Sequence, residues 1–227
     1  MMEIFTKADE PRHPRIFEQM YRQRYDIYVK RRRWEGLGLD GQFEIDQYDT
    51  DDAVYLLALD ETDGVRAGLR LLPTNGPHIF GDLFPHLASG DNPPRGDEIM
   101  ELTRFYVAPF GSNKHQRWWF VGIISIGMFE YCLRNGIKQI SSVIDTFLLP
   151  QMLELGWKVR PLGLPEDYGQ GMAVGVLIDV DEQAIENTRR IRGVEGTVLC
   201  EEHDRSFRIP QHTIISKSQP PHLAGAA

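Results

Sequence analysis

The sequence predicts an α/β (α+β) fold in which helices cover the two faces of a mixed sheet. Short apolar runs of strand length alternate along the chain with longer stretches of helical character, an order that favours helices packed on a sheet. Several strand-like runs come before the first crossover between strands, which argues against a doubly wound nucleotide-binding fold. Each expected element follows from a local pattern.

The N-terminal half is expected to hold a strand, a helix and a β-hairpin. Residues 2–6 have strand character, and apolar residues at near-helical spacing predict a helix over about 16–33. A stretch rich in Gly and Asp then predicts a long loop. The apolar runs 53–60 and 66–73 flank a short turn that contains Asp and Gly, a pattern typical of a hairpin.

The C-terminal half is expected to add four strands and three helices. A strand covers 99–109, and the helix that follows it, 115–135, ends at an Asn-Gly pair. The last helix, expected over 181–193, begins with Asp181 and ends with Gly193, which are good capping residues. The remaining strands are expected at 138–145, 157–163 and 172–180, and the remaining helices at 148–156 and 181–193.

Composition predicts one globular domain over 1–215, followed by a flexible tail over 216–227. The 227 residues are 41% hydrophobic and include 11 Phe, 8 Tyr and 4 Trp, which excludes a disordered chain. The formal charge of -8 argues against a nucleic-acid partner, because phosphate contacts require clustered Lys and Arg. The apolar stretch 118–129 is too short to span a bilayer, and two cysteines make no disulfide framework. We therefore expect a cytoplasmic protein without a membrane partner.

The sequence contains no metal or dinucleotide motif. Its seven histidines are scattered without HxxxH spacing. The segment 169–175 has the spacing GxGxxxG and lacks a strand–turn–helix context. We expect no metal and no cofactor.

Charged residues gather at the end of the first helix and in the loop after it. Six Lys and Arg lie between residues 22 and 33, and six Asp and Glu lie between 40 and 52. Opposite charges so close in sequence usually form weak surface ion pairs. Trp34 and Tyr48 lie in the same stretch, however, and aromatic rings beside carboxylates can receive a cationic, aromatic small molecule. Both interpretations stay open.

The strand 99–109 places Glu101 and Arg104 in a segment otherwise suited to burial. Because strand side chains alternate, Glu101 and Thr103 should face one side of the sheet and Arg104 the other, unless a bulge intervenes. Buried charges are costly unless matched, so these two belong either to a structural ion pair or to a site. Arg70 lies between apolar residues and likewise requires a carboxylate or a ligand.

In their order and spacing, these residues resemble the acyl-homoserine-lactone synthases, the autoinducer synthases of bacterial quorum sensing. The resemblance extends to about residue 180 and rests on Arg24, Tyr28, Trp34, Asp46, Asp49, Arg70, Glu101 and Arg104. It implies a fold similar to the Gcn5-related N-acetyltransferases, with a V-shaped cleft between the central strands 99–107 and 138–145. It also implies two substrates, S-adenosyl-L-methionine (SAM) and an acyl thioester of coenzyme A or acyl carrier protein.

The resemblance implies an acyl transfer followed by ring closure. Glu101 would take a proton from the α-amine of SAM as the amine attacks the thioester, because burial raises a carboxylate pKa toward the useful range. Asp46 would hold the ammonium and Arg104 the carboxylate, and backbone N–H groups near 103–106 would stabilise the oxyanion. The carboxylate would then close the lactone and expel 5′-methylthioadenosine. SAM would be bound by Tyr28, Trp34, Asp46, Arg104 and Phe105, and the loop would be braced by Arg24, Asp49 and Arg70.

Within the family, the segments EIDQYDTDDAVYLL and WKVRPLGLPED resemble rhizobial-type members that take acyl-CoA with branched or aryl acyl groups. The Gcn5-related acetyltransferases usually carry a Gly-rich pyrophosphate loop after this strand, whereas this chain has only Gly111 there, with Lys114 and Arg117 as candidate phosphate partners. Tyr28 stands where many members carry Phe, and so adds a hydroxyl. The implied acyl pocket is lined by the helix 118–131 and by Ser141, Ser142, Phe147, Leu148, Met152 and Leu155. Core packing is the alternative for most of these side chains.

Two other functions stay open on the sequence. A related N-acyltransferase would acylate another amine without closing a lactone, and would release no methylthioadenosine. A non-catalytic ligand-binding domain is the alternative from a different class. The presence of Glu101 together with the charged residues of the loop argues against it.

Overall fold

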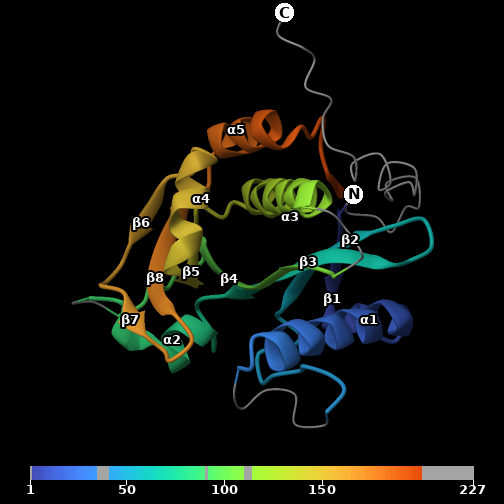
Figure 1. The fold of residues 1–227 in the computed structure, drawn as a ribbon, viewed down its shortest axis with the longest axis horizontal. Coiled ribbons are helices and arrows are strands. Elements are labelled where there is room, and N and C mark those ends of the chain that lie inside the picture. The colour runs from blue at the N-terminus through green and yellow to red at the C-terminus, as the bar shows by residue number, and fades with distance from the viewer. Residues whose placement is uncertain (1, 35–40, 90–91, 110–113, 201–227) are drawn as a thin grey trace, which may run out of the picture.

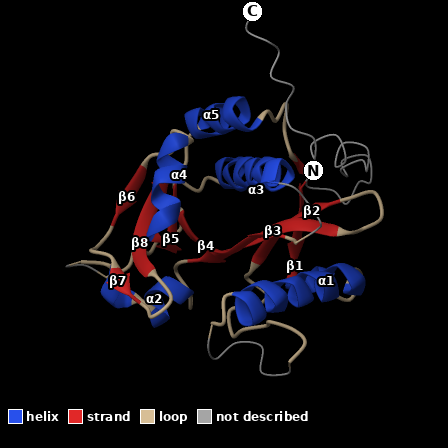
Figure 2. Ribbon diagram, in the orientation of Figure 1, coloured by secondary structure: helices blue, strands red, loops and turns tan. Residues whose placement is uncertain are grey.

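The computed structural model describes residues 2–34, 41–89, 92–109 and 114–200. Within them, nine strands form one mixed sheet in the order β6-β8-β5-β4-β3-β2-β1-β9, and β7 pairs with β8 (Figures 1 and 2). The strands are β1 (Met2–Thr6), β2 (Val54–Leu59), β3 (Val65–Pro73), β4 (Ile99–Val107), β5 (Gln139–Asp145), β6 (Val159–Pro161), β7 (Glu166–Asp167), β8 (Met172–Asp179) and β9 (Leu199–Cys200). The expected α/β fold is confirmed. The expected tail, 216–227, lies outside the described residues.

Helices cover both faces of this sheet. The helices are α1 (Pro14–Arg24), α2 (Ile79–Leu83), α3 (Lys114–Arg134), α4 (Leu149–Glu154) and α5 (Glu182–Arg192). In Figure 1, α1 and α2 lie on one side and α3 and α5 on the other. The side chains of α4 join the same apolar core as those of α3.

The helix expected over 16–33 has two parts. α1 continues without a break into a π-helical segment, Tyr25–Arg31. A π-helix turns more slowly than an α-helix, so this segment shifts the direction of the side chains that follow α1. The sequence predicted the helical length but not this change of pitch.

α3 is the most buried helix and lies between the sheet and α5. Gly127 lets it approach β1 closely, because a Cβ at this position would lie 2.5 Å from the sulfur of Met2. Within the described residues, no helix combines the length and the apolarity that crossing a membrane requires. The apolar character of α3 is therefore explained by burial on two sides.

β4 and β5 separate to form the expected V-shaped opening. They pair in parallel only over three residues, from Ile99 with Gln139 to Glu101 with Ser141, and then diverge. The hydroxyl of Ser142 donates to the carbonyl of Leu102 at 2.9 Å, just past the last pair. This hydrogen bond closes the apex of the opening.

A bulge distorts β4 beside this opening. Arg70 of β3 pairs with Thr103, whereas Gly68 pairs with Tyr106, so β4 carries one extra residue. Arg104 lies inside the bulge with a φ of 52°, a left-handed conformation that non-glycine residues rarely adopt. The bulge changes which side of the sheet Arg104 faces. Arg104 thereby becomes part of the candidate site.

Candidate active site

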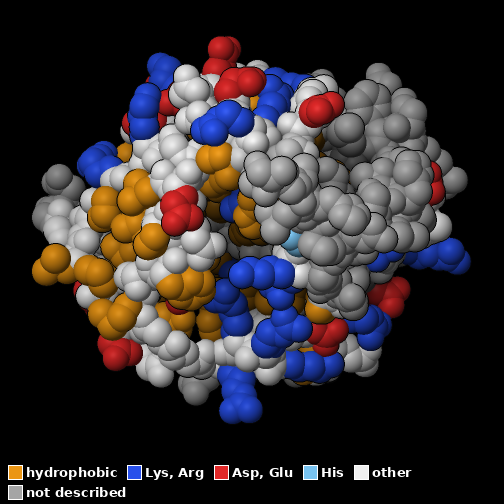
Figure 3. Space-filling view, turned by 45° about the horizontal axis from the view of Figure 1, so that its top comes forward, with side chains coloured by type: hydrophobic (Ala, Val, Ile, Leu, Met, Phe, Trp, Pro, Cys, Tyr) orange, Lys and Arg blue, Asp and Glu red, His pale blue; other side chains and the backbone are white. Residues whose placement is uncertain are grey.

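A cavity of about 1550 Å³ reaches both faces of the sheet through the V-shaped opening. On the side of α1 and α2, its lining includes Tyr28, Trp34, Asp46, Glu101 and Arg104. On the side of α3 and α4, its lining includes Val121, Ser125, Leu148, Met152, Leu155 and Trp157. Pockets for one small ligand usually measure about 300–1,000 Å³, so this cavity has room for two substrates. Figure 3 shows a hollow on one face of the molecule, with Lys and Arg side chains beside it.

Three arginines and three carboxylates form a closed ring of ion pairs on the α1 side of the sheet. The shortest N–O distance in each pair lies between 2.5 and 2.8 Å. Each carboxylate joins two arginines: Glu44 joins Arg24 and Arg104, Asp46 joins Arg104 and Arg70, and Asp49 joins Arg70 and Arg24. We call these six residues the charge ring. Its formal charges cancel, which is what burial of so many ions requires.

The carboxylates of the charge ring differ in their access to the cavity. Glu44 and Asp49 are fully buried, whereas 11% of the Asp46 side chain is exposed and this residue lines the cavity. Burial would raise the pKa of Glu44, but the guanidinium groups of Arg24 and Arg104 lower it to about 2. The pKa of Asp49 is also lowered, because Arg24 and Arg70 outweigh the effect of its burial. Glu44 and Asp49 are thus held as anions, and Asp46 is the ring carboxylate that a ligand can reach.

Glu101 lies outside the charge ring, at the apex of the opening. Its carboxylate accepts hydrogen bonds from the backbone N–H groups of Ile79 at 2.8 Å and Phe80 at 2.7 Å, at the start of α2. Burial raises the pKa of Glu101 to about 7, although both hydrogen bonds oppose the increase. A carboxylate with such a pKa, held in place beside the cavity, is suited to accept a proton near neutral pH.

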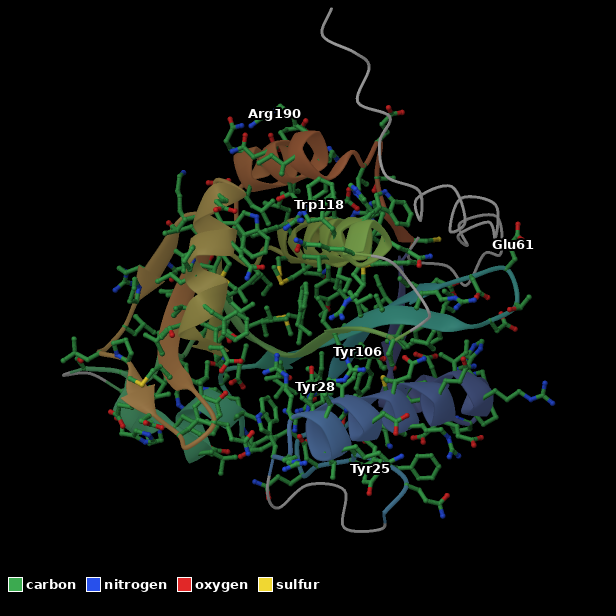
Figure 4. All side chains as sticks on the ribbon, in the orientation of Figure 1. Tyr25, Tyr28, Glu61, Tyr106, Trp118 and Arg190 are labelled. Carbon is green, nitrogen blue, oxygen red and sulfur yellow. The ribbon has the colours of Figure 1, made fainter. Side chains whose placement is uncertain are left out.

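Aromatic side chains line the cavity next to the charge ring. The rings of Tyr28 and Trp34 stack with their centroids 4.8 Å apart, and the guanidinium of Arg104 lies 5.3 Å from the Tyr28 centroid. The hydroxyl of Tyr28 donates to the carbonyl of Phe105 in the bulge at 3.1 Å. In Figure 4, Tyr28 and Tyr106 lie between α1 and the sheet, whereas Tyr25 points away. The hydroxyl that distinguishes Tyr28 from Phe therefore holds the backbone of the bulge.

The structure brings most of the expected acyl-pocket residues to the cavity. Ser142, Phe147, Leu148, Met152 and Leu155 line it on the α3 side. Ser141 does not line the cavity, and its hydroxyl has no hydrogen-bond partner among the described residues. Of the two candidate phosphate partners, Arg117 lines the cavity and Lys114 begins α3 without lining it. Gly111, the lone glycine of the expected loop, lies outside the described residues.

The sequence did not predict two parts of the site. Glu44 joins two arginines of the charge ring, and its position two residues before Asp46 in an extended segment could have placed both on one side. The backbone donors of Ile79 and Phe80 carry no signal in the sequence, because any residues supply the same N–H groups. In the described part of the chain, no group of His, Cys, Asp and Glu could hold a metal ion.

Comparisons with known proteins show which family this chain resembles. The model of the autoinducer synthase family matches residues 9–188. The isovaleryl-homoserine lactone synthase of Bradyrhizobium diazoefficiens is 33% identical over 186 residues, which cover 82% of this chain and 83% of that protein. An acyl-CoA N-acyltransferase from Pseudomonas aeruginosa, 12% identical with a TM-score of 0.52, covers 78% of this chain and 98% of its own, and shares the fold.

Two solved structures match most of the length of this chain. The CoA-dependent acyl-homoserine lactone synthase MesI is 38% identical with a TM-score of 0.81, and the match covers 89% of this chain and all of that one. The CoA-dependent synthase BjaI, solved with SAM and isopentyl-CoA, is 30% identical with a TM-score of 0.79, covering 96% and 98% of the two chains. Because the family model and these relatives span most of its length, the chain belongs to the autoinducer synthase family.

Proposed function

We propose that this protein is an acyl-homoserine-lactone synthase that joins the acyl group of an acyl-CoA to SAM and releases 5′-methylthioadenosine. The observation that carries the proposal is the cavity that reaches both faces of the sheet, with the carboxylate of Glu101 at the crossing. Two large substrates require such a passage, because the amine of one has to meet the carbonyl carbon of the other.

SAM belongs on the α1 side of the sheet in this proposal. The stacked rings of Tyr28 and Trp34 offer an aromatic surface to the adenine and to the positively charged sulfonium. Asp46 is the ring carboxylate with access to the cavity and would receive the ammonium, while Arg104 would receive the carboxylate. Arg24, Asp49 and Arg70 would keep these two side chains in position.

The acyl group belongs on the α3 side, where the lining is mostly apolar. Arg117 lines the same cavity and offers a cation to the phosphates of coenzyme A. Coenzyme A as the donor is supported by the two CoA-dependent relatives, one of which was solved with isopentyl-CoA. Several lining side chains are bulky, which favours a short or branched acyl group.

The first chemical step is acyl transfer. The ammonium of SAM first releases one proton to solvent water and becomes an amine, and the nitrogen then attacks the thioester carbon. The C–N bond forms, the C–S bond breaks, and the second proton passes through Glu101 to the leaving sulfur. Residues 104 and 105 have no partner on β3, so their backbone N–H groups are candidates to stabilise the oxyanion.

The second step closes the lactone. A carboxylate oxygen of the acylated SAM attacks the γ-carbon, and the C–S bond of the sulfonium breaks to release neutral 5′-methylthioadenosine. The sulfonium is a good leaving group and no proton has to move, so correct orientation of the carboxylate is the main requirement. Arg104 would supply that orientation.

Mass spectrometry of the reaction products tests this function directly. The purified protein is incubated with SAM and a pooled panel of acyl-CoAs and acylated carrier proteins, from isovaleryl through aryl to long straight chains. We expect methylthioadenosine together with one acyl-homoserine lactone, made from an acyl-CoA. An N-acyl product without methylthioadenosine would indicate an acyltransferase that forms no lactone. Binding of SAM without any product would indicate a non-catalytic binding domain.

A further inference from the structure

Arg192 is a buried arginine that has no carboxylate partner among the described residues. Among the described residues, three arginines are buried, and two of them, Arg24 and Arg70, belong to the charge ring. Arg192 is 7% exposed, its Nε has no hydrogen-bond partner, and no described carboxylate lies within ion-pair distance. Burial lowers its pKa, and the carboxylate of Glu154 opposes this only from beyond that distance. Buried charges without a partner are rare enough to require an explanation.

Packing on Trp118 does not satisfy the guanidinium of Arg192. The guanidinium carbon lies 4.5 Å from the centroid of the Trp118 ring, which is a favourable cation–π distance. The Trp118 ring offers no lone pair to the five N–H donors of the guanidinium, so this contact replaces none of their hydrogen bonds. The aliphatic part of the side chain lies against Gly122, where a Cβ would be only 2.5 Å from the Cβ of Arg192. Gly122 thus makes room for Arg192 beside α3.

A second polar group without a described partner lies on the face of α3 against which Arg192 packs. Ser125 is fully buried, lines the cavity, and its hydroxyl has no hydrogen-bond partner among the described residues. Residues three and four apart share one face of a helix, so Gly122 and Ser125 face the same side, as do Val121 and Ser125. Arg192 also lines the cavity. The Nε of Arg192 and the hydroxyl of Ser125 are therefore two hydrogen-bonding groups in the α3 half of the cavity that have no partner among the described residues.

Apolar side chains make up much of the remaining lining in this half of the cavity. They are Leu102, Ile144, Leu148, Met152, Leu155 and Trp157. Glu101 lies in the sheet, on β4, whereas Arg192 lies on α5, and α3 lies between α5 and the sheet (Figure 1). A ligand that extends from Glu101 to Arg192 therefore meets these donors at the end far from the sheet. An unbranched or branched hydrocarbon chain would leave both donors unpaired, which costs free energy.

We propose that this part of the cavity receives an acyl group that carries a hydrogen-bond acceptor, a hydroxyl or carboxylate oxygen, at the end far from the thioester. Arg192 and Ser125 would bind that oxygen and so determine which acyl donor is used. The inference rests on the proposed function, because it assigns the acyl group to the α3 side. It concerns donor specificity only, and no bond to Arg192 or Ser125 forms or breaks.

The test compares acyl-CoAs that have equal carbon numbers and differ only at the far end. Hexanoyl-CoA, 6-hydroxyhexanoyl-CoA and adipoyl-CoA form one such set, and octanoyl-CoA, 8-hydroxyoctanoyl-CoA and suberoyl-CoA form a longer one. The measurement is kcat/KM for release of methylthioadenosine from SAM with each donor. In one set at least, we expect the oxygen-terminated donor to exceed the methyl-terminated one by about 10- to 100-fold, the usual effect of a hydrogen bond to a charged group.

Three variants separate specificity from folding. Arg192→Leu should abolish the preference for the oxygen-terminated donor while the methyl-terminated donor still reacts. Ser125→Ala removes one hydroxyl and should reduce the preference by a smaller factor, about 2- to 10-fold. The control is Arg190→Leu on the same helix, because Arg190 is exposed and does not line the cavity (Figure 4). Thermal unfolding of each variant identifies any that fail to fold.

The outcomes distinguish this inference from the proposed function. If no donor gives methylthioadenosine, the function itself is wrong. If the wild type reacts with methyl-terminated donors as well as or better than with their oxygen-terminated partners in both sets, the function holds and the inference is wrong. The inference is also wrong if the preference is the same in Arg192→Leu and Ser125→Ala as in the wild type.

Discussion

Arg104 and Asp46 pair with each other, with Nη2 and Oδ2 2.7 Å apart. The proposed function assigns them to opposite ends of the same amino-acid group, the carboxylate and the ammonium of SAM. The ammonium and the carboxylate of SAM also have opposite charges and lie a few ångströms apart. One amino-acid group can therefore contact both Asp46 and Arg104. Binding of SAM would place its ammonium against Asp46 and its carboxylate against Arg104 while the rest of the charge ring stays paired.

The first prediction concerns Asp46→Asn. The substitution keeps the size of the side chain and removes its charge, so we expect the Kd for SAM to rise about 10- to 100-fold. Isothermal titration calorimetry measures this directly. The control is Asp26→Asn, since Asp26 forms only an exposed ion pair with Lys30 and should leave the Kd unchanged. An unaltered Kd in Asp46→Asn would show that the ammonium is bound elsewhere.

The second prediction concerns Glu101→Gln. The amide cannot accept a proton, so we expect kcat to fall by about 10²- to 10⁴-fold, the usual contribution of a general base. Binding of SAM should change little, because its ammonium is assigned to Asp46. Release of methylthioadenosine and calorimetry measure the two effects. Glu98→Gln is the matched control, since Glu98 forms an exposed ion pair with Lys138. Full turnover in Glu101→Gln would exclude Glu101 as the base.

The third prediction is the pH dependence of the acyl transfer in which Glu101 accepts a proton. Burial raises the pKa of Glu101 to about 7, and only the deprotonated carboxylate can accept a proton. We therefore expect kcat/KM to rise with pH through about 7. The α-amine of SAM also titrates, with a pKa of roughly 8 for such groups. In Glu101→Gln, the pH profile of the residual kcat/KM should show only the transition of the SAM amine. If the pH profiles of the wild type and the variant are identical, Glu101 is not the base.

The same pKa has a consequence for stability. Between about pH 4.5, where an ordinary Glu titrates, and pH 7, the folded protein holds a proton on Glu101 that the unfolded chain has lost. This contribution makes the free energy of unfolding fall as pH rises through that window. Urea unfolding at several pH values should show that Glu101→Gln removes this part of the pH dependence.

Much of the fold could be predicted because its elements have strong local patterns. The helix expected at 115–135 is α3 (Lys114–Arg134), and the hairpin runs 53–60 and 66–73 are β2 and β3. The two-residue strands β7 and β9 were missed, since two residues carry no periodicity. Strands of this kind form because a neighbouring strand offers hydrogen bonds, and that is settled only in three dimensions.

Local sequence patterns did not predict which side chains of the candidate site lie together. Alternation along β4 placed Glu101 and Arg104 on opposite sides unless a bulge intervened, and the bulge at Arg104 brings both to the cavity. No glycine marks that bulge in the sequence. The partners in the charge ring are also distant along the chain, as in the pair of Glu44 with Arg104 across 60 residues. The residue types indicated buried ion pairs, but only the sheet determines which charges meet.

The last prediction concerns the stability of the charge ring. Arg24→Met would leave the buried carboxylates of Glu44 and Asp49 each with one arginine instead of two. Breaking a buried ion pair by removing one partner typically costs about 3–5 kcal/mol, so we expect a loss of that size in the free energy of unfolding at pH 7. The control, Arg22→Met, removes an exposed pair with Glu18 and should cost about 0–1 kcal/mol.

Acid should reduce the difference between Arg24→Met and the wild type. The folded-state pKa values of Glu44 and Asp49 lie below those of the unfolded chain, so their contribution to stability is present above about pH 4.5. It is lost as pH falls toward 2, because the folded protein must then take up the protons that the unfolded chain already holds. Urea unfolding at pH 7 and pH 3 measures both proteins. A deficit in Arg24→Met that is equally large at both pH values would show that packing of the Arg24 side chain, rather than its charge, stabilises this part of the fold.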